Sequence, residues 1–248
     1  MPNLNGKVAI VTGASLGIGA GIAEKLAQDG AAVVVNYRSS TREAAKLVTQ
    51  IESKGGKALA VQADVSTPEG IKALFQKTID KFGKVDILVN NAGVYEFLPI
   101  TDVTAEHIDR LFNLNVKGLL LATQAAVQAF GDRGGSIVNI SSIVSLSPPP
   151  TASVYSATKS AVDAITKSLA QELGPKKILV NSVLPGLTQT EGVDAMANTK
   201  DLLPHFISQT PLGRIGQPND IAGIVSFLAS PDAEWITGQT IGVSGGLR

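Results

Sequence analysis

The sequence predicts an α/β fold, doubly wound around a parallel sheet with helices on both faces. Short runs rich in β-branched residues alternate with longer amphipathic stretches along all 248 residues, which is the pattern of repeated βαβ units. Several of these runs, among them VAIV, AVVV and DILV, are apolar throughout, as expected for strands that are covered on both faces. Hydrophobic residues make up 44% of the chain and charged residues only 17%, so a large core can be buried.

Seven strands are expected where the apolar runs lie, each bounded by glycine, proline or polar residues. Their ranges are Lys7–Thr12, Ala32–Asn36, Lys57–Gln62, Asp86–Asn90, Ser136–Ser141, Ile178–Leu184 and Gln239–Val243. Between them, apolar residues three and four positions apart predict helices. These are Gly19–Asp29, Thr41–Ser53, Pro68–Phe82, Thr104–Phe130, Val154–Leu173 and Pro218–Leu228. No linker or internal repeat divides the chain, so we expect one domain over residues 1–248, with an irregular, lid-like segment at about 186–210.

Charge and residue counts exclude several classes of protein. The 21 Lys and Arg residues equal the 21 Asp and Glu residues, so no overall basic field would hold nucleic acid or an anionic membrane surface. No apolar run reaches the ~18 residues of a membrane helix, and the N-terminus lacks a signal-peptide pattern. The absence of cysteine and the presence of only two histidines argue against disulfides and a metal site. We therefore expect a cytoplasmic protein without nucleic-acid, membrane or metal partners.

A glycine-rich turn follows the first predicted strand. It consists of Thr12, Gly13, Ala14, Ser15, Leu16, Gly17, Ile18 and Gly19. Glycines at such a junction let the backbone approach a pyrophosphate, which the N–H groups and positive end of the next helix attract. The spacing is Gly-x-x-x-Gly-x-Gly rather than the commoner Gly-x-Gly-x-x-Gly. Close packing without a ligand is therefore the alternative.

The second predicted strand leads into Asn36, Tyr37, Arg38 and Ser39. NAD sites usually carry an acid near this point to bind the ribose 2′-hydroxyl, but here Asn36 stands at that place. The guanidinium of Arg38, with the hydroxyl of Ser39, suits a 2′-phosphate instead. The alternative is an arginine solvated in a surface loop.

Two further loops follow the third and fourth strands. Asp64, with Val65 beside it, either accepts a hydrogen bond from an adenine amino group or caps the helix that begins at Pro68. The fourth strand is followed by Asn91, Ala92 and Gly93, whose small side chains would let the backbone lie against a flat ligand. All these loops are expected at the carboxyl ends of the strands, where such sheets bind ligands.

Tyr155 and Lys159 stand four residues apart at the start of a predicted helix, so they face the same side. An ammonium group beside a phenol lowers the pKa of the phenol from ~10 and makes it a usable acid and base. Ser142 follows the preceding strand, where its hydroxyl could hold a carbonyl oxygen. Asn115 lies within an apolar helix, and its amide needs a partner; anchoring a water near Lys159 is one possibility and binding nearby backbone is the other.

These motifs together resemble the short-chain dehydrogenase/reductase family, along essentially the whole chain. The matching residues are Thr12, Gly13, Gly17, Gly19, Asn90, Asn91, Ala92, Gly93, Asn115, Ser142, Tyr155, Lys159, Pro185 and Gly186. The resemblance implies a Rossmann fold with strand order 3-2-1-4-5-6-7. It makes Tyr155 the proton donor, with Lys159 lowering its pKa and binding the nicotinamide ribose. It assigns carbonyl orientation to Ser142 and support of the proton relay to Asn115.

The resemblance also suggests a cofactor and the residues that contact it. Pro185, Gly186 and Thr188 would pass the nicotinamide carboxamide, with Thr190 near it or the phosphates. Many NADP-dependent members carry a basic residue where this chain has Leu16, so the preference for NADP(H) over NAD depends on Arg38 and Ser39. The expected activity is reduction of a small or medium ketone or aldehyde.

Tyr95, Val144 and Leu146, together with Phe97, suggest an apolar and partly aromatic pocket wall, and loop packing is the alternative for the two aromatic residues. The resemblance is closest to 3-oxoacyl-carrier-protein reductases and carbonyl reductases, so a 3-oxoacyl-carrier-protein reductase is the second reading. Arg133 and the pair Lys176–Lys177 are the candidate residues for docking an acidic carrier. Two further alternatives are a sugar or polyol dehydrogenase and a dinucleotide-binding module without catalytic activity.

The two longest predicted helices, Thr104–Phe130 and Val154–Leu173, carry apolar residues on more than one face. A helix of this kind must be buried on more than one face. The family resemblance implies a homotetramer, in which a partner subunit would cover the second face. The alternative is cover by the chain's own segment 186–210.

Overall fold

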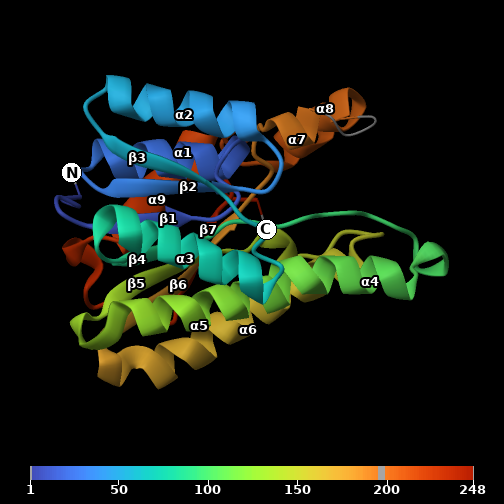
Figure 1. Ribbon diagram of the computed structural model, residues 1–248. Coiled ribbons are helices and arrows are strands. Elements are labelled where there is room, and N and C mark those ends of the chain that lie inside the picture. Colours follow the sequence, from blue (N-terminus) through green and yellow to red (C-terminus); the bar gives the residue numbers. More distant parts are fainter. Residues whose placement is uncertain (1, 195–198, 248) are drawn as a thin grey trace.

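The computed structural model describes residues 2–194 and 199–247. Within these residues the strands form one seven-stranded sheet in the order β3-β2-β1-β4-β5-β6-β7, with all neighbours parallel, which confirms the predicted fold class and strand order (Figure 1). The strands are β1 (Val8–Val11), β2 (Ala32–Tyr37), β3 (Lys57–Gln62), β4 (Ile87–Asn90), β5 (Gly135–Ile140), β6 (Ile178–Pro185) and β7 (Thr240–Val243).

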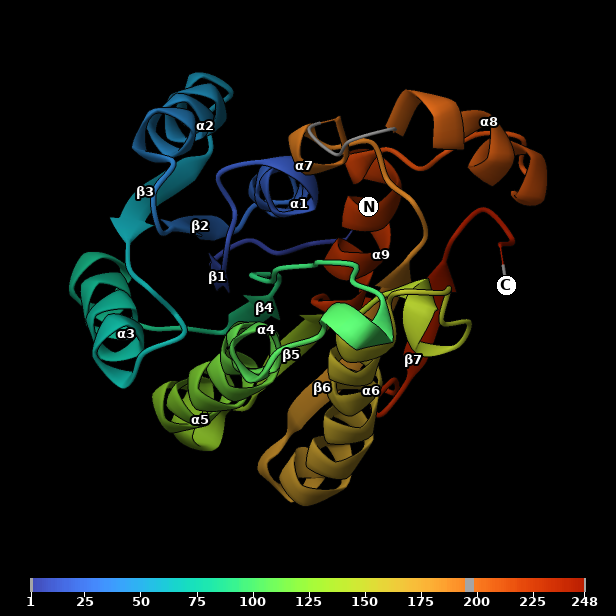
Figure 2. The ribbon, with the colours of Figure 1, turned by 90° about the vertical axis from the view of Figure 1, so that its right-hand side faces the viewer.

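Helices cover both faces of this sheet, as Figure 2 shows along the strands. The described helices are α1 (Gly17–Gln28), α2 (Thr41–Ser53), α3 (Pro68–Phe82), α4 (Ala105–Phe112), α5 (Leu119–Phe130), α6 (Ser153–Leu173), α7 (Glu191–Asp194), α8 (Thr199–Gln209) and α9 (Pro218–Leu228). Their ends follow sequence signals: the Thr67 hydroxyl accepts from the Gly70 N–H ahead of α3, and Gln217 and Asp220 form a capping box at α9.

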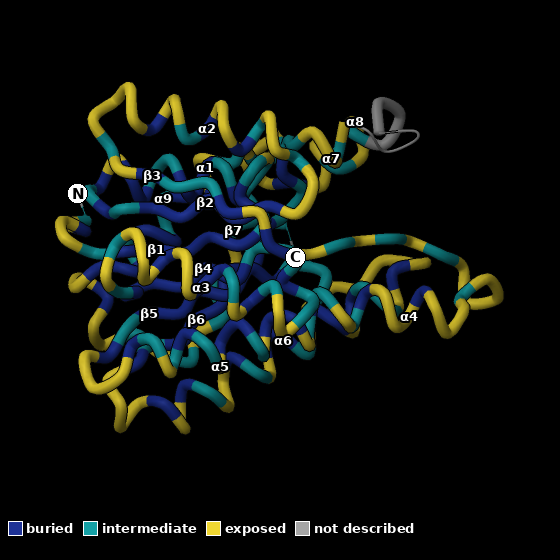
Figure 3. Tube along the Cα trace, viewed as in Figure 1, coloured by how far each residue is buried: buried dark blue, intermediate teal, exposed yellow. Residues whose placement is uncertain are grey.

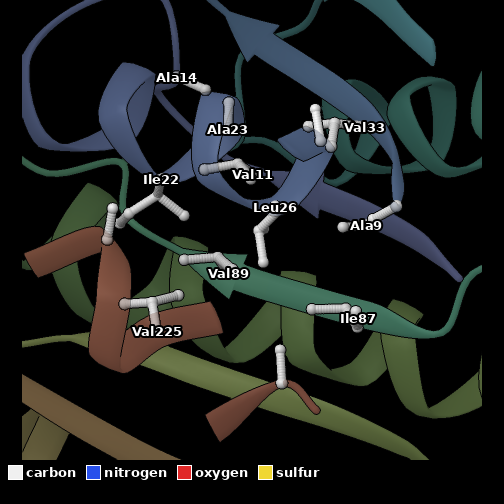
Figure 4. Packing of buried hydrophobic residues seen from close by; sticks show 14 of the residues in the cluster. Ala9, Val11, Ala14, Ile22, Ala23, Leu26, Val33, Ile87, Val89 and Val225 are labelled. Carbon is white, nitrogen blue, oxygen red and sulfur yellow. The ribbon is translucent and has the colours of Figure 1, made fainter. Parts of the chain in front are cut away.

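Two hydrophobic clusters hold these layers together. Ala9 and Val11 of β1 belong to the cluster under α1, α2 and α9, whereas Ile10 belongs to the one under α3, α5 and α6. Alternate strand residues thus enter opposite cores, which explains why the strands are apolar throughout. Figure 4 shows side chains of α1 and α9 packed over β1 and β4, and the strands are the most buried part of the chain in Figure 3.

The helix predicted at residues 104–130 is interrupted. A π-helical turn at Asn113–Gly118 separates α4 from α5. Gly118 passes so close to the loop after β3 that a Cβ there would lie 2.7 Å from the Val65 carbonyl oxygen. Because apolar spacing continues through the turn, the sequence pattern did not reveal the break.

The segment predicted to be irregular, residues 186–210, contains the helices α7 and α8, so that part of the prediction was wrong. Residues 195–198 of it lie outside the described residues. In Figure 1, α7 and α8 lie beyond one side of the strands' carboxyl ends and α4 beyond the other. No described helix is both long and apolar enough to cross a membrane.

Candidate active site

The glycine-rich turn after β1 is tied to the loop after β4. The Asn91 amide donates to the carbonyl oxygens of Thr12 and Gly13 at 2.8 and 2.9 Å, and the Thr12 hydroxyl accepts from the backbone of Asn91 and Ala92. Gly13 has a φ of +60°, and a Cβ there would lie 2.9 Å from the Ala92 Cα. Glycine is therefore required for this close approach.

The first turn of α1 has backbone N–H groups that can attract an anion. The residue before the helix, Leu16, provides no side-chain cap, and the first turn contains no acid. The Gly17 N–H instead donates to the Glu191 carboxylate of α7 at 3.1 Å. A carboxylate seated on a helix N-terminus marks a place where the phosphates of a dinucleotide can bind, so the turn fits such a cofactor.

Asn36, which stands where NAD sites usually carry an acid, binds neighbouring backbone. Its side-chain oxygen accepts from the Gly13 N–H at 3.2 Å, and its amide donates to the carbonyl oxygens of Val61 and Ala63. The buried side chain therefore joins three loops at the strand ends. Tyr37 ends β2 and is buried, whereas Arg38 and Ser39 beyond it are exposed and available to a ligand.

The two predicted roles of Asp64 can now be separated. Thr67 rather than Asp64 caps α3, so the capping alternative was wrong. The Asp64 carboxylate accepts from the backbone and the hydroxyl of Ser66, and these bonds, with a smaller contribution from the positive charge of Arg38, lower the pKa of Asp64. Asp64 and Arg38 therefore lie within electrostatic reach of each other, and Val65 beside them is buried.

The predicted reacting residues come together where β5 ends and α6 begins. Ser142 follows β5 and lies close enough to Tyr155 that its hydroxyl lowers the pKa of the Tyr155 phenol. Lys159 lies one turn further along α6, with its Nζ 5.7 Å from the centre of the Tyr155 ring. A positioned hydroxyl, a phenol and an ammonium group are thereby brought to one place.

The protonation of this group differs from the sequence prediction. Burial raises the pKa of Tyr155 to about 12, and the bond from Ser142 lowers it by less. Burial lowers the pKa of Lys159 to about 8, while the negative charge of Asp163 opposes that shift. Lys159 Nζ donates to the Ile140 carbonyl oxygen at 2.8 Å, and burial of Tyr155 outweighs any lowering of its pKa by the charge of Lys159. In the free chain Tyr155 is thus a neutral phenol.

Asn115 lies in the π-helical turn and is buried. Its side-chain oxygen accepts from the Val94 N–H at 2.9 Å, and its amide donates to the Val94 carbonyl oxygen and the Thr158 hydroxyl at 2.8 and 3.1 Å. Of the two readings left open by the sequence, the binding of nearby backbone is the one observed. The contacts connect the loop after β4 with α6.

The residues after β6 return to the glycine-rich turn. Pro185 ends the strand, and the Thr188 hydroxyl donates to the Gly186 carbonyl oxygen at 3.0 Å. A Cβ on Gly17 would lie 3.1 Å from the Thr190 Cγ2. The chain therefore brings Thr190 and Glu191 against α1, although they lie over 170 residues further on in the sequence.

An aromatic cluster adjoins the Tyr155 ring. The ring centres of Tyr95 and Phe97 lie 6.2 and 5.9 Å from that of Tyr155, both in edge-to-face arrangements. Val144 is half-buried next to Ser142, to which its N–H donates, whereas Leu146 is 66% exposed. The predicted pocket wall is therefore best defined at Tyr95 and Phe97.

Comparison with known proteins agrees with this arrangement. The family model described as enoyl-(acyl carrier protein) reductase matches residues 13–248. A solved short-chain dehydrogenase/reductase from Serratia marcescens is 37% identical, with a TM-score of 0.93 over 98% of each chain. The chain belongs to the short-chain dehydrogenase/reductase family.

Two other members of this short-chain dehydrogenase/reductase family extend the comparison. An uncharacterized oxidoreductase of Methylorubrum extorquens is 55% identical over 100% of both chains. The structure of the angucycline C-6 ketoreductase LanV with bound NADP is 38% identical, with a TM-score of 0.92 over 99% of this chain and 97% of that one. The present chain is an oxidoreductase of the same family.

Two residues near this site, Glu191 and Asp163, were not predicted from the sequence. Glu191 carried no local signal, because its contact with Gly17 is made across the fold. Asp163 had one: it lies four residues after Lys159, on the same face of α6. It is buried and accepts from the Ser182 hydroxyl at 3.1 Å, which places a negative charge near Lys159.

Proposed function

We propose that the chain reduces a ketone or aldehyde to an alcohol, with NADPH as the reductant and Tyr155 as the proton donor. The observation that carries this proposal is the neutral Tyr155 phenol, with a pKa of about 12, held beside Ser142 at the carboxyl edge of the sheet. A phenol that keeps its proton at neutral pH is poised to give it to a carbonyl oxygen. The reaction is reversible, and the reverse reaction, oxidation of the alcohol, would begin from the Tyr155 phenolate.

In the proposed mechanism, Ser142 and Tyr155 bind the carbonyl oxygen through their hydroxyl groups. Bound NADPH supplies the hydride for the carbonyl carbon. Tyr155 gives its proton to the oxygen as negative charge develops there, and Ser142 stabilises that charge by hydrogen bonding. The ammonium of Lys159 stabilises the phenolate that remains. Tyr95 and Phe97 line the apolar side of the site and limit the access of water.

A carbonyl panel tests this proposal directly. Purified full-length protein is mixed with NADPH and a ketone, an aldehyde, an acetoacetyl thioester or a sugar, and the fall in NADPH absorbance is followed. Turnover of ketones or aldehydes supports the proposal. Oxidation of sugars alone, or no turnover with any compound, would contradict it.

The proposed preference for NADPH rests on Arg38 and Ser39, which are exposed at the end of β2. The ketoreductase LanV was solved with NADP, which supports the same choice. Arg38→Ala is expected to weaken NADPH binding by about ten- to a hundredfold, since one charge-assisted hydrogen bond contributes ~1.5–3 kcal/mol. Binding of NADH, which lacks the phosphate, should change little, and calorimetric titration measures both.

Arg133→Ala is the matched control, because it also removes a guanidinium group. Arg133 lies between α5 and β5, at the amino ends of the strands and so away from the proposed cofactor site. The affinity of this variant for both cofactors should equal that of the unaltered protein. Equal losses of NADPH and NADH affinity in Arg38→Ala would show that Arg38 does not recognise the 2′-phosphate.

Reduction is also expected to depend on pH through Lys159. A lysine carries its charge below its pKa, here about 8, whereas Tyr155 keeps its proton up to about 12. The kcat/KM for reduction should therefore fall as the pH rises through 8, by about tenfold between pH 7 and pH 9. Lys159→Arg keeps its charge across this range, so its profile should be flat there. An unchanged alkaline limb in this variant would assign the titration to another group.

The carrier-protein reading has less support. Its candidate docking residues, Arg133 and the pair Lys176–Lys177, precede β5 and β6. They therefore lie at the amino ends of these strands, while Tyr155 and Ser142 lie at the carboxyl ends. A carrier bound there would lie at the other end of the sheet from Tyr155.

We also propose that the chain forms a homo-oligomer in the cytoplasm, with a homotetramer as the expected form. Leu120 of α5 is 41% exposed, and Ile165 and Leu169 of α6 are only half-buried. A partner subunit would cover this apolar surface. A carbonyl compound, and neither nucleic acid nor membrane, is the proposed ligand besides the cofactor.

A further inference from the structure

The segment from Val94 to Leu98, here called the aromatic strap, is fixed at both ends. At one end, the Asn115 side chain binds both the N–H and the carbonyl oxygen of Val94, at 2.9 and 2.8 Å. At the other, the Leu98 N–H donates to the Thr151 carbonyl oxygen at 2.9 Å. The strap therefore spans the distance from the π-helical turn to the start of α6.

Burial alternates along the strap. Tyr95 and Phe97 are 41% and 36% exposed, whereas Val94, Glu96 and Leu98 are half-buried. Both aromatic rings lie beside the Tyr155 ring, whereas the Glu96 side chain, which is 39% exposed, reaches α4. The two rings also contact each other, with centres 6.2 Å apart.

Glu96 anchors the middle of the strap to α4. Its carboxylate forms an ion pair with Arg110, and its Oε2 lies 3.7 Å from the His107 Nε2. His107 is only 5% exposed, and neither of its ring nitrogens has a hydrogen-bond partner among the described residues. A buried imidazole without partners is unfavourable, and Glu96 is the acid placed to become its partner.

We propose that Glu96 is a positioning residue for substrate selection. By binding Arg110 and facing His107, it holds the Tyr95 and Phe97 rings beside Tyr155. There the two rings select carbonyl compounds that have a flat aromatic ring next to the carbonyl group. This inference rests on the proposed reduction. The centres of the two rings lie 6.2 and 5.9 Å from the centre of the Tyr155 ring, and each aromatic contact of this kind changes affinity by a factor of about 2–12. A small aliphatic ketone cannot make these contacts.

The test compares 1-tetralone, whose carbonyl adjoins an aromatic ring, with cyclohexanone, which has a similar carbonyl and no aromatic ring. The unaltered full chain should show the larger kcat/KM for 1-tetralone. Glu96→Gln, which removes the charge at nearly constant volume, should raise KM for 1-tetralone by about 3- to 10-fold. Its kcat for 1-tetralone and its KM for cyclohexanone should stay within about twofold.

Arg110→Gln removes the anchor from the other side and should raise the same KM, and Glu96→Gln combined with Arg110→Gln should add little more. Asp109→Asn is the matched control, because it deletes one exposed negative charge on α4 without touching the strap, and it should leave both KM values unchanged. Calorimetric titration of 1-tetralone into each protein measures the loss of binding without turnover. Melting temperatures show whether each variant is folded.

The two proposals fail in different ways. If the unaltered chain reduces no carbonyl compound, the proposed function is wrong. If it reduces carbonyl compounds but does not prefer 1-tetralone, or if Glu96→Gln weakens both ketones equally, the positioning role of Glu96 is wrong while the reductase function stands. Additive losses in the double variant would likewise overturn the joint action of Glu96 and Arg110.

Discussion

Replacing Tyr155 with phenylalanine is expected to lower kcat for carbonyl reduction by about 10²–10⁴-fold, the usual contribution of a positioned general acid. The substitution keeps the ring, with its contacts to Tyr95 and Phe97, and removes only the hydroxyl. The proton of the product would then have to come from water, which is a far weaker acid.

Single-turnover oxidation of NADPH with a ketone in excess measures the chemical step, and titration of NADPH measures its affinity. The affinity should remain within about threefold, because Tyr155 acts on the carbonyl oxygen. Tyr95→Phe removes the same atom from the neighbouring ring and should cause a much smaller loss of kcat. Turnover within tenfold of the unaltered enzyme in Tyr155→Phe would show that another group donates the proton.

Local patterns were sufficient to predict the fold. The strand predicted at Lys57–Gln62 has those bounds in the structure, and the helix predicted from Pro68 to Phe82 does as well. The strand is signalled by its apolar run and the helix by apolar residues three and four positions apart, and these signals lie within each element. The order of the strands came from the family resemblance and agrees with the structure.

Features that depend on distant residues were not predicted. The sequence showed that Asn36 stands where NAD sites usually carry an acid, but it did not show that the partners of Asn36 are Gly13, Val61 and Ala63. Spacing alone placed Lys159 beside Tyr155, but it did not show that Lys159 binds the Ile140 carbonyl oxygen or that burial raises the pKa of the phenol. A pKa depends on the surroundings of the folded group, and the sequence spacing gives only one neighbour.

Replacing Gly19 with alanine is expected to destabilise the fold strongly, because Gly19 lies where three segments of the chain meet. A Cβ at this position would overlap the Asn91 amide nitrogen and lie 2.6 Å from the Gly13 carbonyl oxygen and 2.9 Å from the Ala14 Cα. The Asn91 side chain would have to leave, and its bonds to Thr12 and Gly13 would be lost. Two hydrogen bonds at ~0.5–1.5 kcal/mol each, with ~1–3 kcal/mol for overpacking, give a destabilisation of about 2–6 kcal/mol for Gly19→Ala.

Gly223→Ala separates this effect from the general consequence of replacing a helical glycine. Gly223 lies within α9, and a Cβ there would meet nothing within 4 Å, so alanine should stabilise the helix by up to about 1 kcal/mol. Gly19→Ala should lower the melting temperature by more than about 5 °C and weaken NADPH binding. Gly223→Ala should raise the melting temperature and leave NADPH binding unchanged. The two positions differ in the atoms that surround the added methyl group. Equal changes in melting temperature and NADPH affinity in the two variants would therefore show that the close approach at Gly19 does not hold the phosphate-binding turn in place.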